Sequence, residues 1–232
     1  MNTKTTFESL MLQFANKHAI HEAFQDFLTV TLGVFTKNPS RTLLMATYAR
    51  YSEAEIKNNF PQILQCLMHE IEDRSKSPLG NDVLGEFYET HISKSEDKRI
   101  LPWEKCVELG SIPISALNII PRHWPIPLLD VGCRSGRIML STSGKAGLKY
   151  EFLGVEYNWD FILITTLNLF FNFHWNSEVL WVDPNNSNAF KESYQILVFP
   201  NGIIRNLDRE KSKAWDQYQT YLSLKKQQAT QG

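Results

Sequence analysis

Short apolar runs after residue 126 alternate with longer apolar-rich stretches, and this alternation constrains the fold more than any other feature. The runs are PLLDVG (127–132), YEFLGVEYN (150–158), SEVLWVD (177–183) and YQILVFP (194–200). The stretches between the first three runs, 137–148 and 159–173, are long enough for crossover helices. This alternation is typical of an α/β fold, so we expect a partial Rossmann-like sheet of about four parallel strands, with right-handed connections and the order 3-2-1-4.

The first part of the chain has helical periodicity instead. Apolar residues recur at helical spacing between 5 and 35, and SEAE (52–55) is a capping box for a helix that Pro61 should kink or restart. A further short helix is expected at 81–92, with Asn81 or Asp82 as its N-cap. Five of the ten prolines lie between 102 and 127. The expected organisation is a helical N-terminal region at 1–95, a proline-rich connector at 96–127 with one short helix at 103–110, and an α/β domain at 128–232.

The turn LLDVGCRSGR (128–137) joins the first expected strand to its helix. Its two glycines lack a Cβ, so a ligand can approach the backbone closely there. Carboxylates close the first three strands, and the carboxyl ends of parallel strands share one edge of a sheet, where a carboxylate can hold both ribose hydroxyls. The alternative is that each acid only caps the next helix. The expected cofactor-binding residues are Asp130, Gly132, Gly136, Glu156 and Asp183.

Charge and cysteine content limit the function classes. Lys plus Arg (24) nearly equals Asp plus Glu (25), so no global positive field attracts nucleic acid. The three cysteines are far apart and fit neither a disulfide framework nor a zinc site, which favours a reduced cytoplasmic protein without a metal. The most apolar run, FILITTLNLFFNF (161–173), is too short and too polar to span a bilayer, so we expect a soluble protein.

Several of these motifs resemble one family. LLDVGCRSGR is similar to the cofactor loop of class I S-adenosylmethionine-dependent methyltransferases, in particular N6-adenine DNA methyltransferases like the modification subunit of type I restriction systems. FLGVEYN (152–158) and VLWVDPNN (179–186) look like their second and third motifs. DVLGEFYE (82–89) resembles a segment that those enzymes carry just before their catalytic domain.

The resemblance implies a methyltransferase-like sheet and S-adenosylmethionine as cofactor. It would place Glu156 on the ribose hydroxyls and Asp183 near the adenine amino group. The chain departs from the family's pattern in several places, among them the segment after DVLGEFYE, where a threonine-proline segment is expected and only Pro102 remains. Arg134 replaces a loop glycine, and FPNG (199–202) keeps one proline of the catalytic Asn/Asp-Pro-Pro-aromatic motif but neither its leading amide or acid nor its closing aromatic. Those groups activate the adenine amino nitrogen and stack on the flipped base, so the catalytic residues stay unknown.

We therefore expect a methyltransferase-like binding module that lacks methyl transfer activity on its own. The alternative is an active S-adenosylmethionine-dependent DNA or RNA adenine methyltransferase, completed by a partner chain. After the last apolar run, the sequence leaves room for one further helix, expected at 208–228. So short a sheet would expose an apolar edge or face. We expect a protein partner, a second copy of the chain or DNA as partners, and no membrane.

Overall fold

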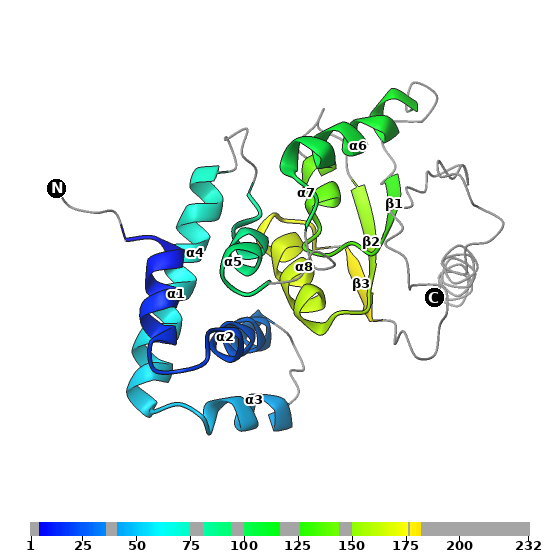
Figure 1. Ribbon diagram of the computed structural model, residues 1–232. Coiled ribbons are helices and arrows are strands. Elements are labelled where there is room, and N and C mark those ends of the chain that lie inside the picture. The colour runs from blue at the N-terminus through cyan, green and yellow to red at the C-terminus, as the bar shows by residue number, and fades with distance from the viewer. Residues whose placement is uncertain are drawn as a thin grey trace.

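Helices make up most of the described structure and lie beside a small parallel sheet (Figure 1). The computed structural model describes residues 5–35, 41–74, 81–93, 100–116, 126–143, 150–175 and 177–181. The helices are α1 (Phe7–Ala15), α2 (Ile20–Phe35), α3 (Arg41–Tyr48), the π-helix η1 (Glu55–Asn59), α4 (Phe60–Arg74), α5 (Val83–His91), α6 (Trp103–Ala116), α7 (Arg137–Ser143) and α8 (Trp159–Phe171). The strands are β1 (Ile126–Val131), β2 (Tyr150–Glu156) and β3 (Glu178–Trp181). None of the described helices has both the length and the apolar character needed to cross a membrane.

Capping residues begin the helices where the sequence predicts them. Glu55 Oε2 accepts from the Ser52 N–H at 2.8 Å, and Ser52 Oγ accepts from the Glu55 N–H at 3.3 Å, which confirms the predicted capping box. The π-helix η1 gives way to α4 one residue before Pro61, as expected for a residue that has no backbone N–H to donate. Of the two candidate caps for α5, Asp82 is the one whose side chain accepts from the Gly85 N–H.

The three strands are parallel, in the order β1-β2-β3. The register pairs Leu128 with Phe152 and Asp130 with Gly154, and Glu156 of β2 pairs with Trp181 of β3. The carboxyl ends of the strands therefore lie along one edge of the sheet, as the alternating pattern predicts. Asp130 and Glu156 both lie near this edge, and the charge of Glu156 contributes to a raised pKa of Asp130.

The predicted fold class, a partial Rossmann-like sheet of about four parallel strands, is wrong. Among the described residues the sheet has three strands, the last only four residues long, and helices predominate. The prediction gave too much weight to the apolar runs after residue 126 and too little to the helices, which fill the larger core. The expected strand at 194–200 and the expected helix at 208–228 lie outside the described residues. The helix expected at 103–110 continues to Ala116 as α6.

Two hydrophobic clusters fill the interior, and α8 contributes to both. The larger cluster joins α1, α2, α4 and α5 to α8, where the ring of Tyr88 lies 4.9 Å from that of Phe161. The smaller cluster lies among β1, β2, α6 and α7 and includes Leu169 of α8. In Figure 1, α8 lies between the N-terminal helices and the strands. The helical region and the sheet therefore pack against opposite sides of the same helix.

Candidate functional site

The glycine turn, Gly132–Gly136, connects β1 to α7 at the carboxyl edge of the sheet. Gly132 and Gly136 have φ angles of 71° and 81°, in the left-handed region that favours glycine. A Cβ on Gly136 would also lie 3.1 Å from Cγ2 of Thr165 in α8. The two glycines thus allow a tight turn that packs directly against α8.

Backbone hydrogen bonds hold this turn to the second strand. The N–H groups of Gly132 and Cys133 donate to the Val155 carbonyl at 2.7 and 3.2 Å. The Arg134 N–H donates to Oε2 of Glu156 at 2.9 Å. The glycine turn and the end of β2 therefore form one hydrogen-bonded unit.

Glu156, the predicted ribose ligand, ends β2 and is only 3% exposed. Besides the Arg134 N–H on Oε2, its Oε1 accepts from the N–H groups of Tyr157 and Asn158, at 2.8 and 3.0 Å. An ionised carboxylate has about four acceptor positions, so these three donors leave about one for a ligand. A ribose diol, which donates twice, would have to displace one of the backbone N–H groups.

Asp130 lies near the end of β1 and is buried, with no hydrogen-bond donor among the residues that the structure describes. Its side chain is 1% exposed, and neither carboxylate oxygen has a hydrogen-bond partner within the described part of the chain. Burial, and secondly the charge of Glu156, raise the pKa of Asp130 from 3.8 to about 7. An unpaired buried carboxylate is costly, so this group favours either a proton or a ligand atom that donates to it.

Arg134 and Cys133 occupy the middle of the glycine turn. Arg134 has a φ of 49°, and its guanidinium carbon lies 5.7 Å from the centre of the Phe161 ring in α8. Burial raises the pKa of the Cys133 thiol well above its ordinary value, which fits a small apolar filler and not a nucleophile. Asp183, the fifth predicted site residue, lies outside the described residues.

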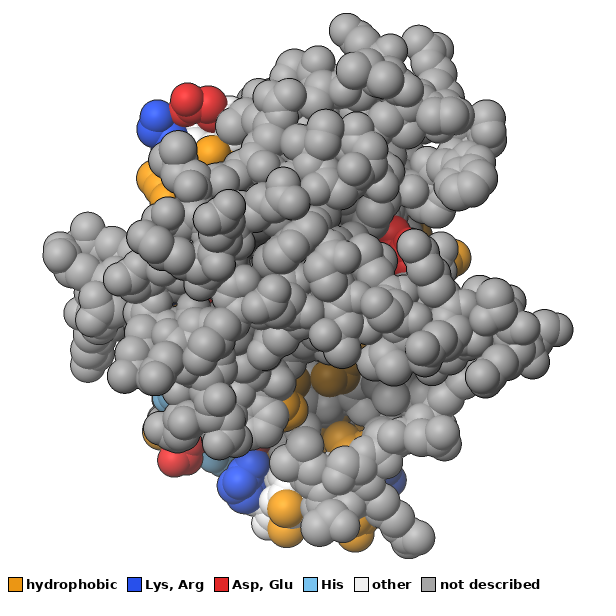
Figure 2. All heavy atoms as spheres, turned by 90° about the vertical axis from the view of Figure 1, so that its right-hand side faces the viewer, with side chains coloured by type: hydrophobic (Ala, Val, Ile, Leu, Met, Phe, Trp, Pro, Cys, Tyr) orange, Lys and Arg blue, Asp and Glu red, His pale blue; other side chains and the backbone are white. Residues whose placement is uncertain are grey.

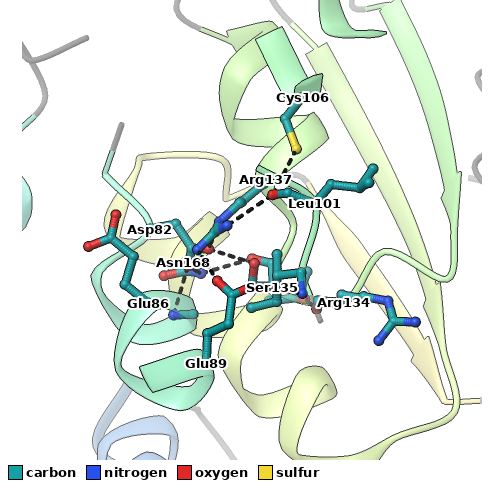
Figure 3. Close-up of polar contacts among 12 residues, drawn as sticks. Asp82, Glu86, Glu89, Leu101, Cys106, Arg134, Ser135, Arg137 and Asn168 are labelled. Carbon is teal, nitrogen blue, oxygen red and sulfur yellow. Dashed lines mark hydrogen bonds and ion pairs between the residues drawn. The ribbon is translucent and has the colours of Figure 1, made fainter. Parts of the chain in front are cut away.

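A buried polar cluster of Asp82, Ser135, Arg137 and Asn168 supports the turn (Figure 3). Oδ2 of Asp82 accepts from Ser135 Oγ and Arg137 Nε, both at 2.6 Å. Its Oδ1 accepts from Asn168 Nδ2 at 2.7 Å and from the Gly85 N–H at 2.8 Å. In Figure 3 the Arg134 side chain points away from this cluster. One carboxylate thus joins the start of α5, the glycine turn and the last turn of α8.

Sequence reasoning missed this cluster and the exposure of two aromatic residues. Tyr157 and Trp159, which follow Glu156, are 40% and 42% exposed, although large aromatic side chains are usually buried. Exposed aromatic rings beside a polar site can stack on a nucleobase. Their position directly after an acidic strand end was the available signal. Figure 2, a view from the side of the sheet, shows several hydrophobic side chains in the lower half of this face.

Metal ligation is not evident in the described part of the chain, where no group of three or more His, Cys, Asp or Glu side chains could hold an ion. His18 and His21, which share a helical spacing, contact different carboxylates. His18 Nε2 lies 3.2 Å from Glu55 and His21 Nε2 lies 2.7 Å from Asp160.

The residues around the glycine turn thus combine a buried carboxyl group that has no donor among the described residues, a second carboxylate and exposed aromatic rings near one sheet edge. No protein-family model matches the chain, and no curated protein matches it either. The chemistry of the residues around the glycine turn suits a ligand with several hydrogen-bond donors and a planar ring.

Proposed function

We propose that the chain is a binding module for a nucleoside-containing cofactor, with S-adenosylmethionine as the first candidate, and that it does not transfer a methyl group on its own. The observation that carries this proposal is Asp130. Its buried carboxyl group has no hydrogen-bond donor among the described residues, although it lies at the sheet edge beside the glycine turn. A ligand that supplies a donor would satisfy it.

S-adenosylmethionine fits these groups in part. Its ammonium group can donate to Asp130, its ribose hydroxyls can donate to Glu156, and its adenine ring can stack on an exposed aromatic such as Tyr157. Because Asp130 is buried, the donor reaches it through a bridging water or after a shift of the turn. Glu156 is the weaker match, since its backbone donors already fill most of its acceptor positions.

Calorimetric titration of the purified chain with S-adenosylmethionine tests the proposal. We expect binding to the wild-type chain, and we expect Glu156→Ala to weaken it by about 1 to 3 kcal/mol, the loss typical of hydrogen bonds to a charged group. The reason is twofold. The variant removes an acceptor for the ligand and also releases the Arg134 N–H that shapes the turn.

Glu151→Ala is the matched control, because Glu151 lies on the same strand near its opposite end. This variant should bind S-adenosylmethionine as the wild type does. S-adenosylhomocysteine and adenosine, titrated in parallel, show which part of the ligand is recognised. Failure of all three ligands to bind the wild-type chain would contradict the proposed function. Equal affinities for Glu156→Ala and Glu151→Ala would place the ligand site elsewhere.

We further expect the purified chain not to methylate adenine at a measurable rate. FPNG (199–202) lacks the acceptor that withdraws the amino hydrogens of adenine, and loss of one such preorganised polar partner typically lowers a rate by about 10² to 10³. The stacking aromatic of the motif is missing as well, which weakens the hold on a flipped base. The measurement is transfer of a labelled methyl group from S-adenosylmethionine to mixed-sequence DNA and RNA.

The same assay distinguishes the alternative enzyme function. Incorporation by the purified chain that disappears in Asn201→Ala would make FPNG a rearranged catalytic loop and would contradict the proposal. Incorporation only after addition of cell extract would support an enzyme completed by a partner chain. An absence of incorporation under both conditions, together with calorimetric binding, is the result expected of a binding module.

A further inference from the structure

The Asp82 carboxylate does more than cap its own helix. Only one of its four donors, the Gly85 N–H, belongs to α5. The other three come from Ser135 and Arg137, which lie in and directly after the glycine turn, and from Asn168 in α8. Asp82, Ser135 and Asn168 are each at most 1% exposed, so water does not replace these bonds when they break.

The glycine turn is held from both sides through these contacts. Arg137, whose side chain is 8% exposed, also donates to the Leu101 carbonyl at 2.9 Å and to Glu89 at 3.1 Å. Asn168 Nδ2 donates to the Ser135 carbonyl at 2.8 Å as well as to Asp82. Hydrogen bonds to β2 hold the first part of the turn, Gly132–Arg134, and the buried polar cluster holds Ser135 near its end.

Gly85 shows how closely α5 approaches this cluster. A Cβ at this position would overlap the carboxylate of Asp82. Any side chain larger than hydrogen at position 85 therefore forces Asp82 away from its present position, and with it the contacts to Ser135 and Arg137.

We propose that Asp82 is a positioning residue for the glycine turn, so that docking of α5 against the turn and ligand binding at the turn are coupled. A ligand that binds only the ordered turn also favours the docked α5, and the coupling is reciprocal. The ligand part of this inference rests on the proposed function. The positioning part does not, because it concerns contacts within the chain.

Hydrogen exchange of the turn amides, measured by mass spectrometry, tests the positioning role without a ligand. The reporters are the N–H groups of Gly132, Cys133, Arg134 and Gly136, all of which are hydrogen-bonded. In Asp82→Ser, the hydroxyl still caps α5 but is too short to replace the other three contacts. We expect the reporters to exchange about tenfold faster or more, the change expected when a hydrogen bond to a charged group is lost.

Asp26→Ser is the matched control for a general loss of stability. Asp26 is also buried and accepts from Arg50 and from Tyr51, but both residues belong to the turn after α3, in the N-terminal region. We expect this variant to leave the turn reporters close to their wild-type rates. Exchange of the turn in Asp82→Ser at the wild-type rate, or no faster than in Asp26→Ser, would reduce Asp82 to a cap and overturn the proposal.

Gly85→Ala provides a second variant that tests the same contact from the opposite direction. Alanine favours helix more than glycine does, so an effect limited to helix propensity would slow hydrogen exchange of the amides in α5. Displacement of Asp82 by the new Cβ would accelerate exchange of the turn amides instead, which is the result expected here. If the turn amides of Gly85→Ala exchange more slowly than those of the wild-type chain, the result counts against the positioning role, even if Asp82→Ser fails to fold.

Titration of Asp82→Ser with S-adenosylmethionine tests the coupling. We expect affinity at least about tenfold lower than in the wild-type chain, since part of the binding energy must then order the turn. Equal affinities would disprove the coupling. If the wild-type chain binds no ligand, the proposed function fails, whereas the exchange comparison still decides the role of Asp82.

Discussion

Replacing Asp130 by asparagine is expected to remove the stability loss that the Asp130 carboxyl group causes between about pH 4 and about pH 7. Burial, and then the charge of Glu156, raise the pKa of Asp130 from 3.8 to about 7 in the folded chain. The folded state therefore keeps a proton that the unfolded state releases. The contribution of the Asp130 proton to the free energy of unfolding is fully present below the pKa of Asp130 in the unfolded chain. It is lost as the pH rises through the pKa of Asp130 in the folded chain, by about 4 kcal/mol in total.

The measurement is urea unfolding of both proteins at a series of pH values from 4 to 8. Asparagine does not titrate, so the difference in unfolding free energy between variant and wild type should shift in favour of the variant as the pH rises. The values at pH 4 are an internal control, because Asp130 is then mostly neutral in the folded chain. Curves that remain parallel over the whole range would show that Asp130 is not the group responsible.

Phe24→Ala is expected to lower the free energy of unfolding by about 3 to 5 kcal/mol, the usual cost of removing a fully buried phenylalanine ring. Phe24 of α2 is 0% exposed, and its ring centre lies 4.9 Å from that of Phe87 and 6.5 Å from that of Tyr88 in α5. The variant leaves a cavity at the contact between these two helices. The midpoint of urea unfolding, compared with that of the wild type, measures the loss.

Phe173→Ala is the control for this variant. Phe173 is 77% exposed and has a positive φ of 64°, a conformation that strains alanine as much as phenylalanine. Its replacement should change the free energy of unfolding by no more than about 0.5 kcal/mol. Similar losses in the two variants would contradict the packing of α2 against α5.

Features that depend on neighbouring residues could be predicted from the sequence. The N-cap at Asp82, the capping box at Ser52 and the helix restart near Pro61 each involve residues within one helical turn. The three strands likewise form where short apolar runs predict them, and their parallel pairing follows from the crossover helices. The predicted meeting of Asp130 and Glu156 at one sheet edge is a consequence of that pairing.

Contacts between distant segments could not be predicted in the same way. Asp82 bonds Ser135 and Asn168, which are 53 and 86 positions away, and no spacing rule connects them. The Arg134 N–H that donates to Glu156 was also hidden, because this contact depends on the path of the turn. The fold class was wrong for a related reason, since apolar runs do not reveal how much of the interior the helices occupy.

The central place of α8 affects how such a chain can change during evolution. Its side chains are buried along most of its length, from Phe161 to Leu169, in clusters on both of its sides. A helical region taken from another protein would have to match this helix in shape before it could replace the present one. The N-terminal helices therefore cannot be replaced by unrelated helices without loss of packing against α8. Substitutions that reshape α8 require compensating changes in both halves of the molecule.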